Sequence, residues 1–85
     1  MFELEIDDDT ADSLESLSKN VRERIFNKLI STKENPHHFF IRLVEREDFK
    51  LRVGDYRIIA DIDEISKIIK VTKIGHRKNI YKNKK

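Results

Sequence analysis

The order of apolar and polar residues divides the chain into a strand, two helices and a run of further strands. Apolar and acidic residues alternate from Phe2 to Ile6, which is the pattern of a half-buried strand. A first helix is predicted at about residues 11–17, with Asp9 or Thr10 as its N-cap, because their side-chain oxygens can accept a hydrogen bond from the first helical turn. The chain therefore begins with a strand that leads into a helix.

The second predicted helix has the clearest helical periodicity in the chain. Ser18 or Asn20 can cap it, and the helix must end before Asn35–Pro36, because the residue before a proline disfavours helical backbone. Between these limits runs an apolar stripe of Val21, Ile25, Leu29, Phe26 and Ile30. The two helices are expected to form an αα-hairpin.

The second half of the chain has mainly strand periodicity. Residues 37–47 fit neither period, and we expect a connection that anchors some of its apolar side chains on the core. Three strands follow at residues 49–53, 56–62 and 67–74, with turns at Gly54–Asp55 and Asp63–Glu64, and Gly75 ends the alternation. The order β-α-α-β-β-β predicts one compact α+β domain over residues 1–85. Its antiparallel sheet carries the helical hairpin on one face, and the first strand pairs at the other side of the sheet.

The Gly54–Asp55 turn fixes the register of the hairpin, since glycine accepts the positive φ that primed turns require. Arg52 then lies opposite Arg57, and Lys50 lies on the same face one pair further along. Like charges directly opposite each other are destabilising, so we expect an anion from a ligand or from the chain to lie between the arginines. The alternative is that surface ion pairs neutralise them, with Asp61, Asp63 or Glu47 as the acids.

Composition narrows the class of protein. The chain has 85 residues, of which 38% are hydrophobic and 40% charged, and its apolar residues are periodic, so a single folded core is expected. Cysteine is absent, which excludes disulfides and thiolate metal sites and fits a reducing cytosol. No run of 18 apolar residues is present, so we expect a soluble cytoplasmic protein with no membrane association.

Charge is distributed unevenly along the chain. Residues 1–18 hold seven acidic residues and no Lys or Arg, whereas residues 65–85 hold eight basic residues and no acid. A basic end beside a basic hairpin attracts polyanions at long range. The alternative is that these charges only solvate the surface, and residues 82–85 are expected to be a flexible basic tail.

Most standard active sites are excluded. The adjacent His37 and His38 are poor metal ligands and are expected in a loop, and with only Gly54 and Gly75 the chain lacks a glycine-rich phosphate loop. Neither a metal nor a cofactor is therefore expected. Phosphate chemistry by cations remains: RNA can be cut by its own 2′-OH when a base, an acid and cations on the transition state are supplied.

Two motifs together resemble the RelE toxins of the RelE/ParE superfamily. They are Lys50-Leu51-Arg52-Val53-Gly54-Asp55-Tyr56-Arg57 and Lys73-Ile74-Gly75-His76-Arg77-Lys78-Asn79-Ile80-Tyr81. The resemblance implies the toxin of a type II toxin–antitoxin module, a metal-independent endoribonuclease that cleaves mRNA in the ribosomal A site by 2′-OH attack and so inhibits translation. The catalytic residues it implies are Lys50, Arg52, Arg57, Arg77 and Tyr81. Asp48 stands where some relatives have a further lysine, which makes the cationic cluster thinner.

The resemblance also implies partners. A RelB-like antitoxin is expected to cover the apolar groove of the helices in a heteromeric complex, and mRNA and the 30S A site are the expected targets. The expected RNA contacts are Lys73, His76, Lys78 and Lys82, and His76 is an alternative proton donor. Two other functions stay open: a ParE-like toxin that poisons DNA gyrase without enzymatic activity, and a non-catalytic RNA or ribosome binder.

Overall fold

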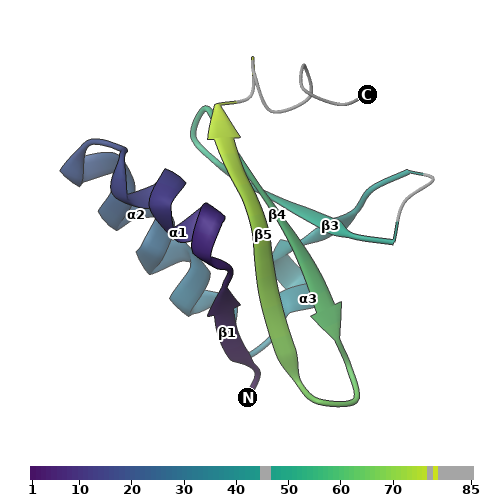
Figure 1. The fold of residues 1–85 in the computed structure, drawn as a ribbon. Helices are drawn as coiled ribbons and strands as arrows, with labels where there is room; N and C mark the ends of the chain where they lie inside the picture. Colours follow the sequence, from purple (N-terminus) through teal and green to yellow (C-terminus); the bar gives the residue numbers. More distant parts are fainter. Residues whose placement is uncertain (45–46, 77, 79–85) are drawn as a thin grey trace.

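The structure is a computed structural model that describes residues 1–44, 47–76 and 78, and it has the predicted α+β architecture (Figure 1). The elements in chain order are β1 (Glu3–Ile6), α1 (Asp8–Glu15), α2 (Lys19–Ser31), α3 (Pro36–Phe39), β2 (Ile41–Arg42), β3 (Phe49–Val53), β4 (Tyr56–Asp63) and β5 (Ile68–His76). The short α3 and β2 occupy the segment that was expected to be an irregular connection, so that expectation is wrong in detail. Phe40, between them, is only 4% exposed and provides the expected anchor on the core.

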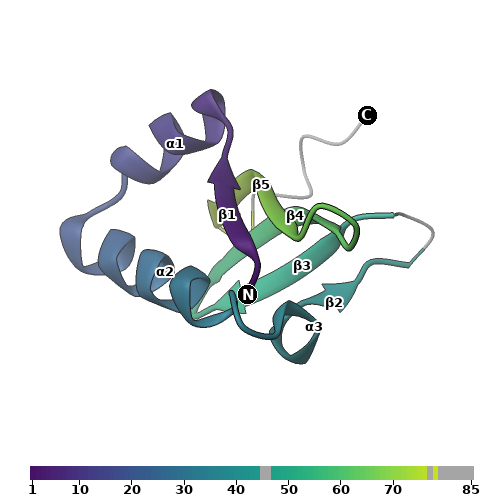
Figure 2. The same ribbon diagram turned by 90° about the horizontal axis from the view of Figure 1, so that it is seen from below.

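The sheet has the strand order β1-β5-β4-β3-β2. The predicted position of the first strand at the far side of the sheet is confirmed: β1 pairs with β5 and runs parallel to it, while the other neighbours are antiparallel. Helices α1 and α2 lie on the same side of the sheet, with α1 packed on β5 and α2 on β3 (Figure 2). The other side, which we call the outer face, is turned away from these helices.

The first helix begins earlier than the sequence predicted. Its N-cap is Asp7, not Asp9 or Thr10, and the Thr10 backbone N–H donates to Asp7 Oδ1 at 3.0 Å. Hydrogen bonding from the Thr10 side chain and backbone lowers the pKa of Asp7. Three consecutive acids each have a suitable capping oxygen, and the cap at Asp7 leaves Asp8 and Asp9 in the first turn, where the helix dipole favours negative charge.

Helix α2 begins after Ser18 and ends well before Pro36, as predicted, although the Ser18 side chain makes no capping hydrogen bond. Ile25 and Leu29 are fully buried in the core together with residues of β4 and β5, and Phe26 and Ile30 of the same stripe are 45% and 43% exposed. The Arg22 guanidinium of α2 donates to the carbonyl oxygens of Glu15 and Leu17 at 3.3 and 3.1 Å. These bonds connect α2 to the end of α1.

Gly75 does not end the last strand. Strand β5 continues through it to His76, and Gly75 pairs with Arg57 of β4. The glycine lacks the positive φ that would turn the chain, and cross-strand pairing overrides its weak strand propensity. The flexible basic tail predicted at residues 82–85 lies outside the described residues.

The turn between β4 and β5 is closed by Asp63, whose Oδ1 accepts from the backbone N–H groups of Ile65 and Ser66 at 3.0 and 3.2 Å. These hydrogen bonds lower the pKa of the Asp63 carboxyl group, and those from Ser66 have the largest effect. Within the described ranges, none of the helices has the length and apolar character needed to cross a membrane.

Candidate anion-binding face

The β3–β4 hairpin has the register that the sequence predicted. Val53 pairs with Tyr56, Arg52 with Arg57, Leu51 with Ile58 and Lys50 with Ile59. Gly54 has φ +58° and Asp55 does not have a positive φ, which is the pattern of a type II′ turn with glycine in its first central position. The glycine therefore sets which side chains share a face of the sheet.

Four cations lie in two adjacent rows on the outer face of the sheet. One row across the strands consists of Arg52, Arg57 and Gly75, and the adjacent row of Lys50, Ile59 and Lys73. Ile59 is only 4% exposed although it points away from the core, so an apolar side chain lies between the two lysines of the second row. Gly75 adds no side chain next to Arg57, and the charged side chains of these two rows are all positive.

The guanidinium of Arg57 is the least satisfied polar group on this face. Its Nε and Nη1 are buried and have no hydrogen-bond partner among the described residues. Within residues 1–44, 47–76 and 78, no ion pair joins Arg52 or Arg57 to Asp61, Asp63 or Glu47, the acids considered as alternative partners. A buried donor without a partner costs about 1–3 kcal/mol, and an anion bound between the two arginines removes that cost.

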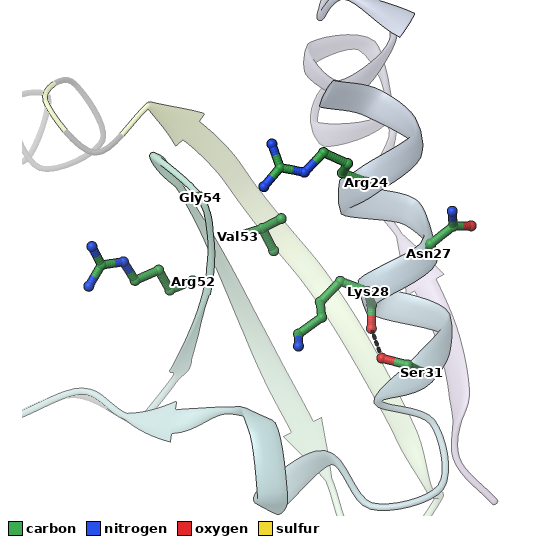
Figure 3. Close-up of a pocket in the computed structure, with 7 residues that line it drawn as sticks. All are labelled: Arg24, Asn27, Lys28, Ser31, Arg52, Val53 and Gly54. Carbon is green, nitrogen blue, oxygen red and sulfur yellow. Dashed lines mark hydrogen bonds between the residues drawn. The ribbon is translucent and has the colours of Figure 1, made fainter. Parts of the chain in front are cut away.

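A second group of cations lies on the helix side of the hairpin. A cleft of about 520 Å³ separates α2 from the end of β3, and we call it the α2–β3 cleft (Figure 3). Its lining residues are Arg24, Asn27, Lys28, Ser31, Arg52, Val53 and Gly54. The approach of Arg24 and Lys28 to the hairpin is a tertiary contact and has no local signal in the sequence.

The sequence model of the ParE toxin of type II toxin–antitoxin systems (parDE) matches residues 4–81. The chain belongs to this family, within the RelE/ParE toxin superfamily. No sequence among the curated proteins matches the chain.

Solved structures with a similar fold are RelE toxins at low sequence identity. The toxin in the E. coli RelBE toxin–antitoxin complex is 20% identical, with a TM-score of 0.78 over 89% of this chain and 96% of that one. The toxin in the RelBE2 complex of Mycobacterium tuberculosis is 16% identical, with a TM-score of 0.83 over 89% of this chain and 98% of that one. The toxin in the archaeal RelE–RelB complex of Pyrococcus horikoshii OT3 is 22% identical, with a TM-score of 0.75 over 92% of this chain and 97% of that one. This similarity confirms the RelE-like fold.

The structure separates His76 from the cations of the outer face. His76 pairs with Tyr56, so both side chains are on the helix side, where the rings meet edge to face at 5.5 Å between centroids. The Lys78 backbone N–H donates to His76 Nδ1 at 3.2 Å, which requires an unprotonated Nδ1 and places the proton of a neutral ring on Nε2. The sequence analysis grouped His76 with the site because it lies beside Arg77 in the second motif.

The remaining predicted site residues have different positions. Lys73 is exposed on the outer face opposite Ile59, and Lys78 is exposed after the end of β5. Asp48 precedes β3, where its carbonyl oxygen accepts from the Leu43 N–H at 3.0 Å. Strand alternation places it on the same face as Lys50. Three predicted residues, Arg77, Tyr81 and Lys82, lie outside the described part of the chain.

The two adjacent histidines belong to α3 and not to a loop. His37 Nε2 contacts the Glu64 carboxylate in the turn between β4 and β5, and His38 packs edge-on against Phe39. In the part of the chain that the structure describes, no three or more His, Asp or Glu side chains are grouped so that they could hold a metal ion. The histidines therefore connect α3 to its surroundings.

Proposed function

We propose that this toxin cleaves mRNA in the ribosomal A site and thereby stops translation. The observation that carries the proposal is the buried, unpartnered guanidinium edge of Arg57 directly opposite Arg52. Two guanidinium groups on directly opposed strand positions suit a phosphodiester, because its negatively charged oxygens can accept hydrogen bonds from both groups. In the next row, Lys50 and Lys73 extend the positive field along the face.

The proposed reaction is a transfer within the RNA. The 2′-oxygen attacks the adjacent phosphorus and loses its proton to a base, while the bond from phosphorus to the 5′-oxygen breaks and that oxygen takes up a proton. Arg52 and Arg57 hold the phosphate, and with Lys50 and Arg77 they stabilise the charge that builds up on its oxygens. Tyr81 stacks on a base or takes part in the proton transfers. The reaction uses no metal or cofactor.

The proposed partners follow from the family and from the shape of the helices. A RelB-like antitoxin binds the toxin and blocks it, as the solved complexes of RelE relatives with RelB support. Phe26, about half exposed, lines a groove with Leu14 and Arg22 between α1 and α2, and this groove suits an apolar helix of the antitoxin. Because its target is the ribosome, the toxin acts in the cytoplasm.

A ParE-like activity is the second candidate, because the family model that matches the chain describes a ParE toxin. Such a toxin poisons DNA gyrase without cutting a nucleic acid itself. It needs neither the opposed arginines nor an unsatisfied guanidinium on the outer face.

Ribosomes programmed with a defined mRNA separate the two activities. We expect the wild-type protein to produce a new 3′ end inside the A-site codon, detected by primer extension, and a 2′-deoxy nucleotide at that position to abolish it. Arg57→Gln should reduce the rate by about 10²–10³-fold, the usual effect of removing one charge-stabilising donor. Lys19→Gln, an equal charge change at an exposed position of α2, serves as the control. Intact mRNA together with trapped gyrase–DNA complexes would instead establish the ParE-like activity.

A further inference from the structure

The α2–β3 cleft is a second strongly positive site on the molecule. Arg24 points from α2 toward the β3–β4 turn, and Lys28 points from α2 into the cleft away from that turn, whereas the Arg52 side chain leaves β3 on the opposite side (Figure 3). Asn27 and Ser31 supply neutral polar groups, and none of the described residues that line the cleft is acidic. Its positive charges are therefore not balanced by the residues that line it.

The two cations of the cleft are positioned by uncharged neighbours. Arg24 Nη2 is 3.2 Å from the point where a Cβ at residue 54 would lie, so its guanidinium approaches the backbone of the turn as closely as a glycine permits. Lys28 Nζ lies 4.9 Å from the centroid of the Phe39 ring. Within the described ranges neither side chain forms an ion pair. Both remain available to an anion.

The cleft and the outer face meet at the end of β3. Strand β2 pairs only with Phe49 and Lys50, so the part of β3 that carries Arg52 and Val53 is a sheet edge in the described structure. The backbone of Arg52 lines the cleft, and its guanidinium belongs to the outer face. A flexible polyanion that passes around the β3–β4 turn can therefore contact both groups of cations.

We infer that the α2–β3 cleft binds a phosphodiester segment of RNA away from the cleaved bond, with Arg24 and Lys28 as its phosphate contacts. This inference rests on the proposed function, because it extends the path of the same RNA. Single-stranded RNA suits the cleft better than an acidic peptide does: Val53 is the only apolar residue among the described residues that line it, and peptide segments in grooves need apolar anchors. A positive groove that follows the backbone is the usual way to hold single-stranded nucleic acid.

The test measures binding without cleavage. A fluorescent 2′-O-methyl RNA of about 16 nucleotides, long enough to span one such site, is titrated with the full-length protein over a range of salt concentrations. The variant Arg24→Gln/Lys28→Gln removes two phosphate contacts at exposed and half-buried helix positions. The slope of log K against log salt should become less steep by about 1.4, or about 0.7 for each contact with a single strand.

The matched control is Lys19→Gln/Lys70→Gln, which changes the net charge equally. Both lysines are exposed, and Lys70 lies between Glu5 and Asp61 across the strands. The control should retain the wild-type slope. Asn27→Glu, at another exposed position of α2, should also weaken RNA binding. It tests the same cleft in case the double variant fails to fold.

Three results would overturn the inference: an unchanged slope in the double variant, an equal loss in the control, or tighter binding of a polyglutamate peptide than of RNA at the cleft. None of them depends on cleavage, because the RNA lacks a free 2′-OH. Conversely, a protein that fails to cut mRNA on ribosomes but shows the predicted slope change would refute the proposed activity and retain the cleft as an RNA-binding site.

Discussion

Replacing Arg57 by methionine should stabilise the free protein. Methionine keeps an unbranched side chain of similar reach and removes the guanidinium, whose Nε and Nη1 are buried without partners. Removing such unsatisfied donors gains about 1–2 kcal/mol, taking the lower part of the usual range because the side chain is only partly buried. For a domain of this size the melting temperature rises by about 4–8 °C per kcal/mol, so we expect Arg57→Met to melt about 4–16 °C higher than wild type.

Thermal unfolding followed by circular dichroism measures this difference. Arg52→Met is the matched control, because it relieves the same repulsion from an exposed position and should change stability by less than about 0.5 kcal/mol. Sulfate should raise the melting temperature of wild type more than that of Arg57→Met, since its general salting-out effect acts on both proteins and an anion that binds only the folded state adds to it in wild type. A melting temperature of Arg57→Met below that of wild type would refute the reasoning and make Arg57 a structural residue.

Three further predictions concern the scaffold of the site. Gly54→Ala should destabilise the protein by about 1–2 kcal/mol in urea unfolding, because Gly54 has φ +58° and alanine is strained there; an unchanged midpoint would contradict the turn assignment. Ile25→Ala should cost about 2–5 kcal/mol because Ile25 is fully buried, while Ile30→Ala, at 43% exposure, should cost far less; equal losses would contradict the described core. The pKa of Asp7 is lowered from 3.8 by Thr10, so its contribution to stability is present above pH 3.8 and lost as pH falls through the folded-state pKa. Asp7→Ala should therefore lower the melting temperature at pH 7, and the difference should shrink in acid; a difference that persists at pH 2 would contradict the cap.

The predictions that the structure confirms in detail are those that a single short segment of sequence determines. The Gly54–Asp55 turn fixed every pair of the β3–β4 hairpin, and hence the opposition of Arg52 and Arg57. The apolar stripe of α2 identified Ile25 and Leu29 as core residues. Both cases depend on periodicity within a few residues of a clear start or stop.

The features that the sequence missed depend on contacts between distant segments. Gly75 has low strand propensity, but its pairing with Arg57 continues β5 and thereby moves His76 to the helix side. The approach of Arg24 to Gly54, which forms the α2–β3 cleft, joins residues thirty positions apart without any local pattern. The assignment of Asp7 as the cap could not be made from sequence because its two neighbours are also aspartates.

The most direct test of the account compares mRNA cleavage on programmed ribosomes by wild type and Arg57→Met. The account predicts that wild type cuts the A-site codon and that the more stable variant is slower by about 10²–10³-fold, because the group that destabilises the free fold is the one that holds the phosphate. Equal cleavage by the two proteins would contradict the claim that Arg57 forms the anion site. No cleavage by wild type would contradict the proposed ribonuclease activity itself.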